Sequence, residues 1–357
     1  MSGASGFPEP ATSPAIVPDA TPRDAPATGV TVALTCWNAA WCVERALDSV
    51  FAQTRPPDEV IVTDDGSTDD TVERLRRYGE RVRVLELPHI GLTPSRRAAI
   101  EAVRTPWFAL LDADDWWMPE RIERQLAFLA RHPEVQWLST DGAYVSADGV
   151  LRESWLSGYF DPVPEMAGDL FPHIVRRCFP LVSSSLIRRD AYDAVGGLDD
   201  VTYSQDYALW LRLAARFPGG LMPDRLIAYW SSPGQLSRRT EERYRDDQRL
   251  MERVVSGEYR RDPEAQKVAR EKVASYHFDL GVTCLRSGRF REGRTRLWRA
   301  ATSAGPLRRR SLALFGALAP RWSLGRLMRS PWLKRTVSGA RRDHPAMPGE
   351  TPREVGQ

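Results

Sequence analysis

Apolar residues gather in short runs along the first third of the chain, at residues 30–36, 59–63, 82–85 and 107–111. These runs are rich in valine, leucine and isoleucine and have the length of buried strands. Between them, apolar residues recur three and four positions apart, as on one face of a helix. Helices are therefore expected at residues 41–53, around Val72 and Leu75 with Ser67 or Thr68 as N-cap, and at residues 95–103. This alternation predicts an α/β fold with a mostly parallel central sheet covered by helices.

The pattern changes after this first half. Residues 119–131 have helical periodicity, residues 135–138 form another apolar run, and Asp148-Gly149 has the composition of a turn. Mixed α/β patterning continues to about Ser237. Beyond Thr240 the sequence becomes helical and rich in arginine, which predicts an all-helical segment after the α/β domain.

Four segments are expected from these changes in composition. Residues 1–29, rich in proline, alanine, serine and glycine, are interpreted as a disordered leader, because they lack the basic start and apolar core of a secretory signal. Residues 30–240 form the α/β domain. Residues 241–305 form a helical appendage that faintly resembles a single tetratricopeptide unit, which would have to pack on the domain or on a partner. Residues 306–357 form a basic, amphipathic tail.

Composition excludes some classes of protein. A net charge of +3 on 357 residues gives no indication of a nucleic-acid-binding surface. The four cysteines form no Cys-x-x-Cys pair, which favours buried thiols in a reducing compartment over a metal site. Because no run of about 18 apolar residues occurs, a spanning helix is not expected. These features predict a cytoplasmic protein, either soluble or peripheral at the inner face of the plasma membrane.

Polar clusters follow three of the predicted strands, at residues 35–38, 64–65 and 112–115. In open parallel sheets, ligands bind at the carboxyl ends of the strands, so these clusters are expected at one edge. Alternate side chains of an extended segment point the same way, so Asp112 and Asp114 can present two carboxylates to one point. Mg²⁺ or Mn²⁺ suits such a site, because the ion completes its shell with water and phosphate oxygens. The alternative is that these aspartates only cap the helix predicted to begin near Pro119.

The amino-acid sequences of three segments are more specific for a protein family than any one polar cluster. They read Thr35-Cys36-Trp37-Asn38, then Val-Ile-Val-Thr-Asp-Asp-Gly-Ser-Thr-Asp-Asp-Thr at residues 60–71, then Leu-Leu-Asp-Ala-Asp-Asp-Trp-Trp-Met-Pro-Glu at residues 110–120. In this order and spacing, residues 30–237 resemble the inverting glycosyltransferases of family two, which have the GT-A fold. The resemblance implies a nucleotide-diphosphate-sugar donor, a divalent metal and inversion at the anomeric carbon.

The same resemblance implies roles for residues of the donor site. Thr35 and Asn38 match the first-strand segment that lines the nucleoside, and Asp65 matches the aspartate that binds the base. A carboxylate accepts from a pyrimidine ring N–H, which suits a UDP- or dTDP-sugar. Arg96 matches an arginine near the donor phosphates, although the neighbouring Arg97 departs from the usual asparagine. The alternative for Asp64 and Asp65 is an Asx turn before the next helix, and Asp64 is expected to have this structural role. The alternative for Arg96 and Arg97 is a solvated helix face.

The second half must supply a general base for the acceptor hydroxyl. Residues 195–199 and 204–213 resemble the family's acceptor-side motif, in which Asp206 takes the position of the base and Gln205 replaces the usual glutamate. The alternative for Asp206 is an N-cap of the helix carrying Trp210 and Leu213, which are core residues in either case. Residues 229–237 resemble the family's closing loop but lack its basic residue or histidine before Arg238.

Residues 306–342 hold ten arginines and lysines and no acidic residue, interleaved with leucine, phenylalanine and tryptophan. This composition suits an interfacial helix on an anionic membrane, or else a basic face packed within the protein. A saccharide or lipid-linked acceptor is expected, in cell-surface polysaccharide or glycoconjugate synthesis. The alternatives are a sugar-phosphate nucleotidyltransferase, which normally has a Gly-rich phosphate loop that residues 35–40 lack, and an inactive glycosyltransferase-like scaffold.

Overall fold

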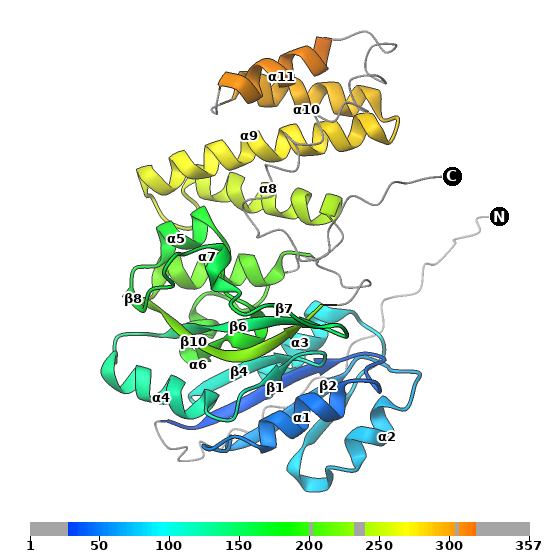
Figure 1. Ribbon diagram of the computed structural model, residues 1–357, viewed down its shortest axis with the longest axis vertical. Helices are drawn as coiled ribbons and strands as arrows, with labels where there is room; N and C mark the ends of the chain where they lie inside the picture. Colours follow the sequence, from blue (N-terminus) through cyan, green and yellow to red (C-terminus); the bar gives the residue numbers. More distant parts are fainter. Residues whose placement is uncertain (1–27, 200–202, 232–239, 304–306, 319–357) are drawn as a thin grey trace, which may run out of the picture.

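The structure is a computed structural model that describes residues 28–199, 203–231, 240–303 and 307–318. A ten-stranded sheet with helices against it forms one part of the molecule, and four long helices are stacked beyond α5 and α7 (Figure 1). The leader to residue 27, the closing loop from residue 232 and the tail from residue 319 lie outside the described residues.

The first half of the chain forms the parallel part of the sheet, as predicted. The strands lie side by side in the order β3-β2-β1-β4, and all three pairings are parallel. The elements are β1 (Val30–Cys36), α1 (Val43–Phe51), β2 (Glu59–Asp64), α2 (Thr71–Arg76), a 3-10 turn η1 (Gly79–Arg81), β3 (Arg83–Glu86), α3 (Leu92–Glu101) and β4 (Trp107–Asp112).

The expected cap of the second helix is wrong. α2 begins only at Thr71, because the backbone N–H and the hydroxyl of Ser67 both bind the carboxylate of Asp64 and close a separate turn. The carboxylate of Asp69 accepts the N–H of Thr71 at 3.0 Å at the start of the helix.

The second half makes the sheet mixed. β9 lies antiparallel between β4 and β6, β6 pairs parallel with β10, and β5 pairs antiparallel with β10. The expected turn lies in the hairpin between β6 and β7. The elements are β5 (Trp116–Trp117), α4 (Arg121–Arg131), β6 (Trp137–Ser146), β7 (Gly149–Arg152), η2 (Leu156–Gly158), β8 (Met166–Gly168), α5 (Phe171–Arg176), η3 (Val182–Ser184), β9 (Leu186–Arg188), α6 (Arg189–Ala194), α7 (Gln205–Arg216) and β10 (Gly219–Trp230).

The C-terminal helices are α8 (Thr240–Ser256), α9 (Pro263–Arg286), α10 (Phe290–Thr302) and α11 (Leu307–Leu318). The hydrophobic core of the sheet domain continues into α8 and the first part of α9, through Leu250, Met251, Val254, Ala269 and Tyr276. A second, smaller core joins the rest of α9 to α10 and α11. Within the described residues, no helix combines the length and hydropathy needed to cross a bilayer.

Candidate active site

The three polar strand ends are brought together by the parallel register. Thr35 of β1 is paired with Thr63 of β2 on one side and with Asp112 of β4 on the other. Asp65 follows β2 directly, and its backbone N–H donates to the carbonyl of Cys36 at 2.9 Å. The clusters expected at one edge therefore lie at that edge.

Thr35 and Asn38 lie in and after the end of β1. Thr35 is buried, and its hydroxyl accepts a hydrogen bond from the hydroxyl of Thr63 at 3.2 Å. Asn38 has a positive φ of 48°, and its side-chain oxygen accepts the backbone N–H of Thr68 at 2.8 Å. Asn38 therefore ties the β1–α1 turn to the aspartate-rich loop after β2.

Asp65 is buried and organises the loop between β3 and α3. Its carboxylate accepts the backbone N–H groups of Ile90 and Gly91 at 2.8 and 2.9 Å, and one oxygen lies 3.0 Å from Nδ1 of His89. The ring of His89 stacks on Trp37 with centroids 4.7 Å apart, and the indole of Trp37 is 53% exposed. Sequence reasoning left both aromatic residues out of the site, although Trp37 stands inside the first motif.

Arg96 and Asp112 form an ion pair across the site. Arg96 projects from α3, is almost fully buried, and donates to Oδ1 of Asp112. The alternative of a solvated helix face is therefore wrong for Arg96. Arg97 donates to the backbone carbonyl of Leu198 at 3.0 Å.

The acidic tetrad, Asp112-Ala113-Asp114-Asp115, does not cap a helix. α4 begins only at Arg121, and Asp115 is 1% exposed, so the alternative that these aspartates cap the helix is wrong. Its carboxylate accepts the backbone N–H of Trp230 at 2.8 Å and the hydroxyl of Ser183. Burial, followed by the negative charges of Asp114 and Asp112, raises the pKa of Asp115 well above its usual range. Asp115 thus joins the tetrad to the end of β10.

Asp206 lies in the first turn of α7, inside the helix, and Ser204 occupies the N-cap position. The N-cap alternative for Asp206 is therefore wrong. Burial raises the pKa of its carboxyl, opposed by the N–H of Tyr207 and the positive charge of Arg96, and the negative charge of Asp112 raises it further. Trp210 and Leu213 are fully buried, as expected.

Arg45 of α1 is a second component that sequence reasoning missed. Its guanidinium donates to the backbone carbonyl of Asp114 at 3.0 Å and lies over the rings of Trp116 and Trp230, 4.0 and 4.8 Å from their centroids. Trp41 packs on Trp230 with centroids 6.1 Å apart and is 60% exposed. The sequence shows only that Arg45 lies in the first predicted helix. The fold is what brings its guanidinium to the carbonyl of Asp114.

The donor set limits how a metal could be held. In the described part of the chain, no group of three or more histidine, cysteine, aspartate or glutamate side chains is arranged around one point. An ion there would take most of its ligands from water and from a bound diphosphate, which is the usual manner of Mg²⁺. All four cysteines are free and buried, as expected.

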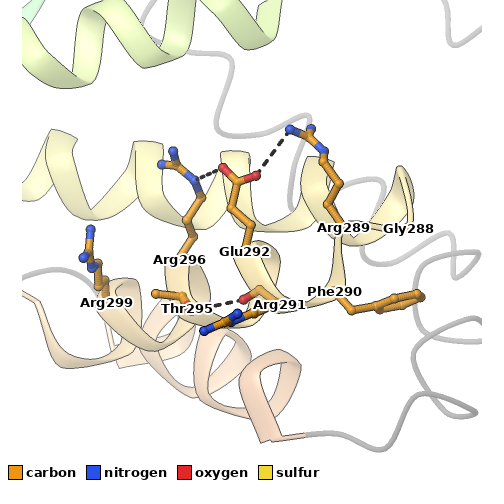
Figure 2. Close-up of a pocket in the computed structure, with 8 residues that line it drawn as sticks. All are labelled: Gly288, Arg289, Phe290, Arg291, Glu292, Thr295, Arg296 and Arg299. Atoms are coloured by element: carbon orange, nitrogen blue, oxygen red, sulfur yellow. Dashed lines mark hydrogen bonds and ion pairs between the residues drawn. The ribbon is translucent and has the colours of Figure 1, made fainter.

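A cavity of about 690 Å³ lies elsewhere, at the turn between α9 and α10 (Figure 2). Its lining residues are Gly288, Arg289, Phe290, Arg291, Glu292, Thr295, Arg296 and Arg299. Glu292 pairs with Arg289 at 3.4 Å and with Arg296 at 3.0 Å. None of the site residues above lines this cavity, so it is separate from the strand-end edge.

Residues 31–192, from β1 into α6, match the family model described as Glycosyl transferase family 2. The UDP-Glc:alpha-D-GlcNAc-diphosphoundecaprenol beta-1,3-glucosyltransferase WfaP of Escherichia coli is 24% identical over 193 residues, which are 52% of this chain and 70% of that protein. An uncharacterised glycosyltransferase of Rickettsia felis is 28% identical over 189 residues, or 49% of this chain. This match covers only 28% of the length of the Rickettsia protein.

A solved structure is similar over most of the chain. The crystal structure of S. aureus TarS 1–349 in complex with UDP-GlcNAc matches with a TM-score of 0.63 at 16% identity, over 86% of this chain and 92% of that one. At this identity the likeness shows the shared fold.

Proposed function

Residues 31–192 of the chain form a glycosyltransferase family 2 domain with the GT-A fold, and on that premise we propose that the protein transfers a sugar from a nucleoside diphosphate sugar to a hydroxyl group, with inversion. The observation that carries the proposal is the ion pair of the buried Arg96 of α3 with Asp112 of β4, two charges that also act on the pKa of the buried Asp206 of α7. A cation for phosphates and a carboxylate with a raised pKa are what such a transfer needs.

The donor nucleoside is proposed to lie along Thr35, Asn38 and Asp65. A carboxylate offers about four acceptor positions, and two backbone N–H groups and His89 use three of those of Asp65. One position is left for the ring N–H of uracil or thymine, which favours a UDP- or dTDP-sugar. The exposed indole of Trp37 beside this carboxylate offers a flat face on which a base can stack.

The diphosphate and a divalent cation, Mg²⁺ or Mn²⁺, are proposed to lie between Arg96 and the tetrad. Asp114 is the principal ligand in this proposal, and Asp112, which binds Arg96, is the second. Burial raises the pKa of Asp115, and the negative charges of Asp114 and Asp112, which a cation would neutralise, raise it further. Bound there, the cation would stabilise the charge of the departing diphosphate.

Asp206 is proposed as the general base that takes the proton from the acceptor hydroxyl. Its raised pKa brings the carboxylate closer to the working pH and makes it a stronger base than an exposed aspartate. The positive charge of Arg96 acts in the opposite direction, lowers this pKa and favours the ionised form. The acceptor is proposed to be a saccharide or a lipid-linked saccharide in polysaccharide or glycoconjugate synthesis, in line with the name of the Escherichia coli relative.

The C-terminal helices are proposed to rest on an anionic membrane surface at the inner face of the plasma membrane. Trp298 of α10 and Leu314, Phe315 and Leu318 of α11 are 41–66% exposed, and the sequence that follows α11 is basic. Exposed apolar side chains with arginines are typical of interfacial helices. The test is flotation with phosphatidylglycerol-containing liposomes: the full chain should float, and a chain ending at residue 305 should not. Equal flotation of both would refute the membrane contact.

The function is tested by supplying nucleotide sugars with and without Mg²⁺ or Mn²⁺ and measuring binding, slow hydrolysis and transfer. We expect binding of a uridine or thymidine diphosphate sugar that strengthens with the metal, and loss of this metal effect in Asp114→Ala. Metal-independent binding that is unchanged in Asp114→Ala would rule out the metal assignment. Formation of a nucleotide sugar from a sugar phosphate would favour the nucleotidyltransferase instead.

A further inference from the structure

We propose that the helical appendage is part of the active site's framework, in which Asp247 of α8 and Lys272 of α9 are positioning residues for the first turn of α7, the turn that carries Asp206. This rests on the proposed role of Asp206 as base. Neither residue is expected to touch substrate. Both act through Ser204 and Tyr207, which lie on either side of Gln205 and Asp206 in the chain.

Asp247 holds the beginning of α7. It is 2% exposed, and its Oδ1 accepts the hydroxyl of Ser204 at 2.7 Å, while Oδ2 accepts the hydroxyl of Tyr276 from α9 at 3.4 Å. The carbonyl of Ser204 accepts the N–H of Ala208 at 3.0 Å, so Ser204, which Asp247 binds, also makes the first helical hydrogen bond of α7. The carboxylate therefore fixes the point from which the turn starts.

Lys272 holds the same turn from the other side. Its buried Nζ donates to the hydroxyl of Tyr207 at 3.3 Å and to the carbonyls of Val175 and Arg176 at 3.2 and 3.4 Å. The Tyr207 hydroxyl in turn donates to the carbonyl of Ile174 at 3.2 Å. The ammonium group thus joins α9, the end of α5 and the residue directly after Asp206.

α8 also binds the chain that leads into this turn. Arg253 pairs with Asp199 at 2.8 Å, and Asp199 pairs with Arg212 of α7 at 3.0 Å. Oδ2 of Asp246 accepts the backbone N–H of Tyr203 at 3.1 Å. The appendage therefore fixes residues 199, 203 and 204 as well as Tyr207.

These polar contacts are more than is needed to attach the helices. Leu250, Met251 and Val254 of α8 already lie in the core of the sheet domain. Burying a carboxylate and an ammonium is costly unless both are well bonded, and the bonds made here converge on one turn. A base misplaced by about 1 Å can lose about a hundredfold in rate, so a rigid support of this kind has a direct catalytic consequence.

The test compares Ser204→Ala, which removes the hydroxyl that Asp247 binds, with Ser204→Thr, which keeps it. We expect kcat to fall about tenfold in Ser204→Ala with an unchanged KM for the donor, and to recover in Ser204→Thr. Lys272→Met should behave like Ser204→Ala. The matched control is Gln248→Ala, next to Asp247 and also buried, whose side chain bonds to Glu252 and to Arg296 of α10. It should keep the wild-type kcat.

Amide hydrogen exchange gives a readout that needs no activity. The first turn of α7 should exchange faster in Ser204→Ala and at the wild-type rate in Gln248→Ala and Ser204→Thr. If Ser204→Ala does not fold, Tyr276→Phe, which removes the longer of the two bonds to Asp247, is measured in its place. Wild-type kcat together with unchanged exchange in these variants would overturn the proposal. An inactive wild-type protein with the expected exchange would instead count against the function proposed for the site.

Discussion

At the scale of single residues, the acidic groups of the site differ in environment more than in chemistry. Asp64 and Asp69 hold turns, Asp112 is paired with Arg96, and Asp115 is fully buried. Asp206 differs from all of these, because its main hydrogen bond is to the N–H of the next residue and burial raises its pKa. Local motifs locate such residues, but the surroundings decide what each can do.

Asp206→Asn is expected to lower kcat by about 10²- to 10⁴-fold, the usual contribution of a general base. The variant should nevertheless be at least as stable as the wild type at neutral pH. A carboxyl whose pKa is raised in the folded protein stabilises it fully below its ordinary value of 3.8, and this stabilisation is lost as pH rises through the folded pKa. Thermal unfolding from pH 3.5 to 7.5 checks this: the advantage of Asn should grow with pH. If the stability of Asp206→Asn relative to wild type were lower at pH 7 than at pH 4, the prediction would be contradicted.

The pH dependence of transfer follows from the same carboxyl. Only the ionised form accepts a proton, so kcat should fall on the acid side with an apparent pKa above 3.8, the ordinary aspartate value. Asp112→Asn removes a negative charge that raises this pKa, and it should move the acid limb to lower pH. A pH–rate profile of transfer measures both, and an acid limb that moves to higher pH in Asp112→Asn would contradict the assignment.

At the scale of elements, the parallel half was predictable and the mixed half was not. The runs at β1, β2 and β4 are mostly apolar and are separated by amphipathic helices, a pattern that specifies parallel neighbours without reference to the rest of the chain. β9 has only three residues, and its place between β4 and β6 depends on pairings across about 80 and 50 positions. The twelve-residue β10 also carries register irregularities near Met222 and Arg225, which no periodic pattern reveals.

The pairing of β6 with β10 gives a prediction for this mixed half. A Cβ at Gly142 would overlap the side chain of Ile227 and come within 2.8 Å of its carbonyl oxygen. Gly142→Ala should therefore destabilise the protein by about 1–3 kcal/mol, the cost of overpacking. Gly149→Ala is a poor control because its φ is 115°, so Ala143→Ser, on the same strand, is used instead. Urea unfolding measures the difference, and a Gly142→Ala variant as stable as wild type would contradict the packing.

At the scale of the whole molecule, the appendage divides into two parts. α8 and the first part of α9 share the core of the sheet domain, whereas α10 and α11 build a second core with the rest of α9. A boundary drawn at residue 240 therefore follows the secondary structure but cuts through the core. The sequence predicted that this region is helical, but not which core each helix completes.

Two truncations separate these parts. A chain ending at residue 239 loses core side chains of α8 and α9 and should not fold, whereas a chain ending at residue 305 should fold with a modest loss of stability. Circular dichroism and calorimetry of both chains check this. A stable, cooperative domain ending at residue 239 would show that the shared core is dispensable, and it would also argue against the positioning role of Asp247.

The sequence by itself determined the parallel half of the sheet, the polar strand ends and the family motifs, because each depends on residues adjacent in the chain or on a simple period. Only the tertiary structure decided that Asp206 shares an electrostatic environment with Arg96 and Asp112, although about 100 positions separate them. It also placed Arg45 against the Asp114 carbonyl and Asp247 against Ser204. These contacts depend on how sheet and helices pack over long range, and packing is set by all of the core residues together.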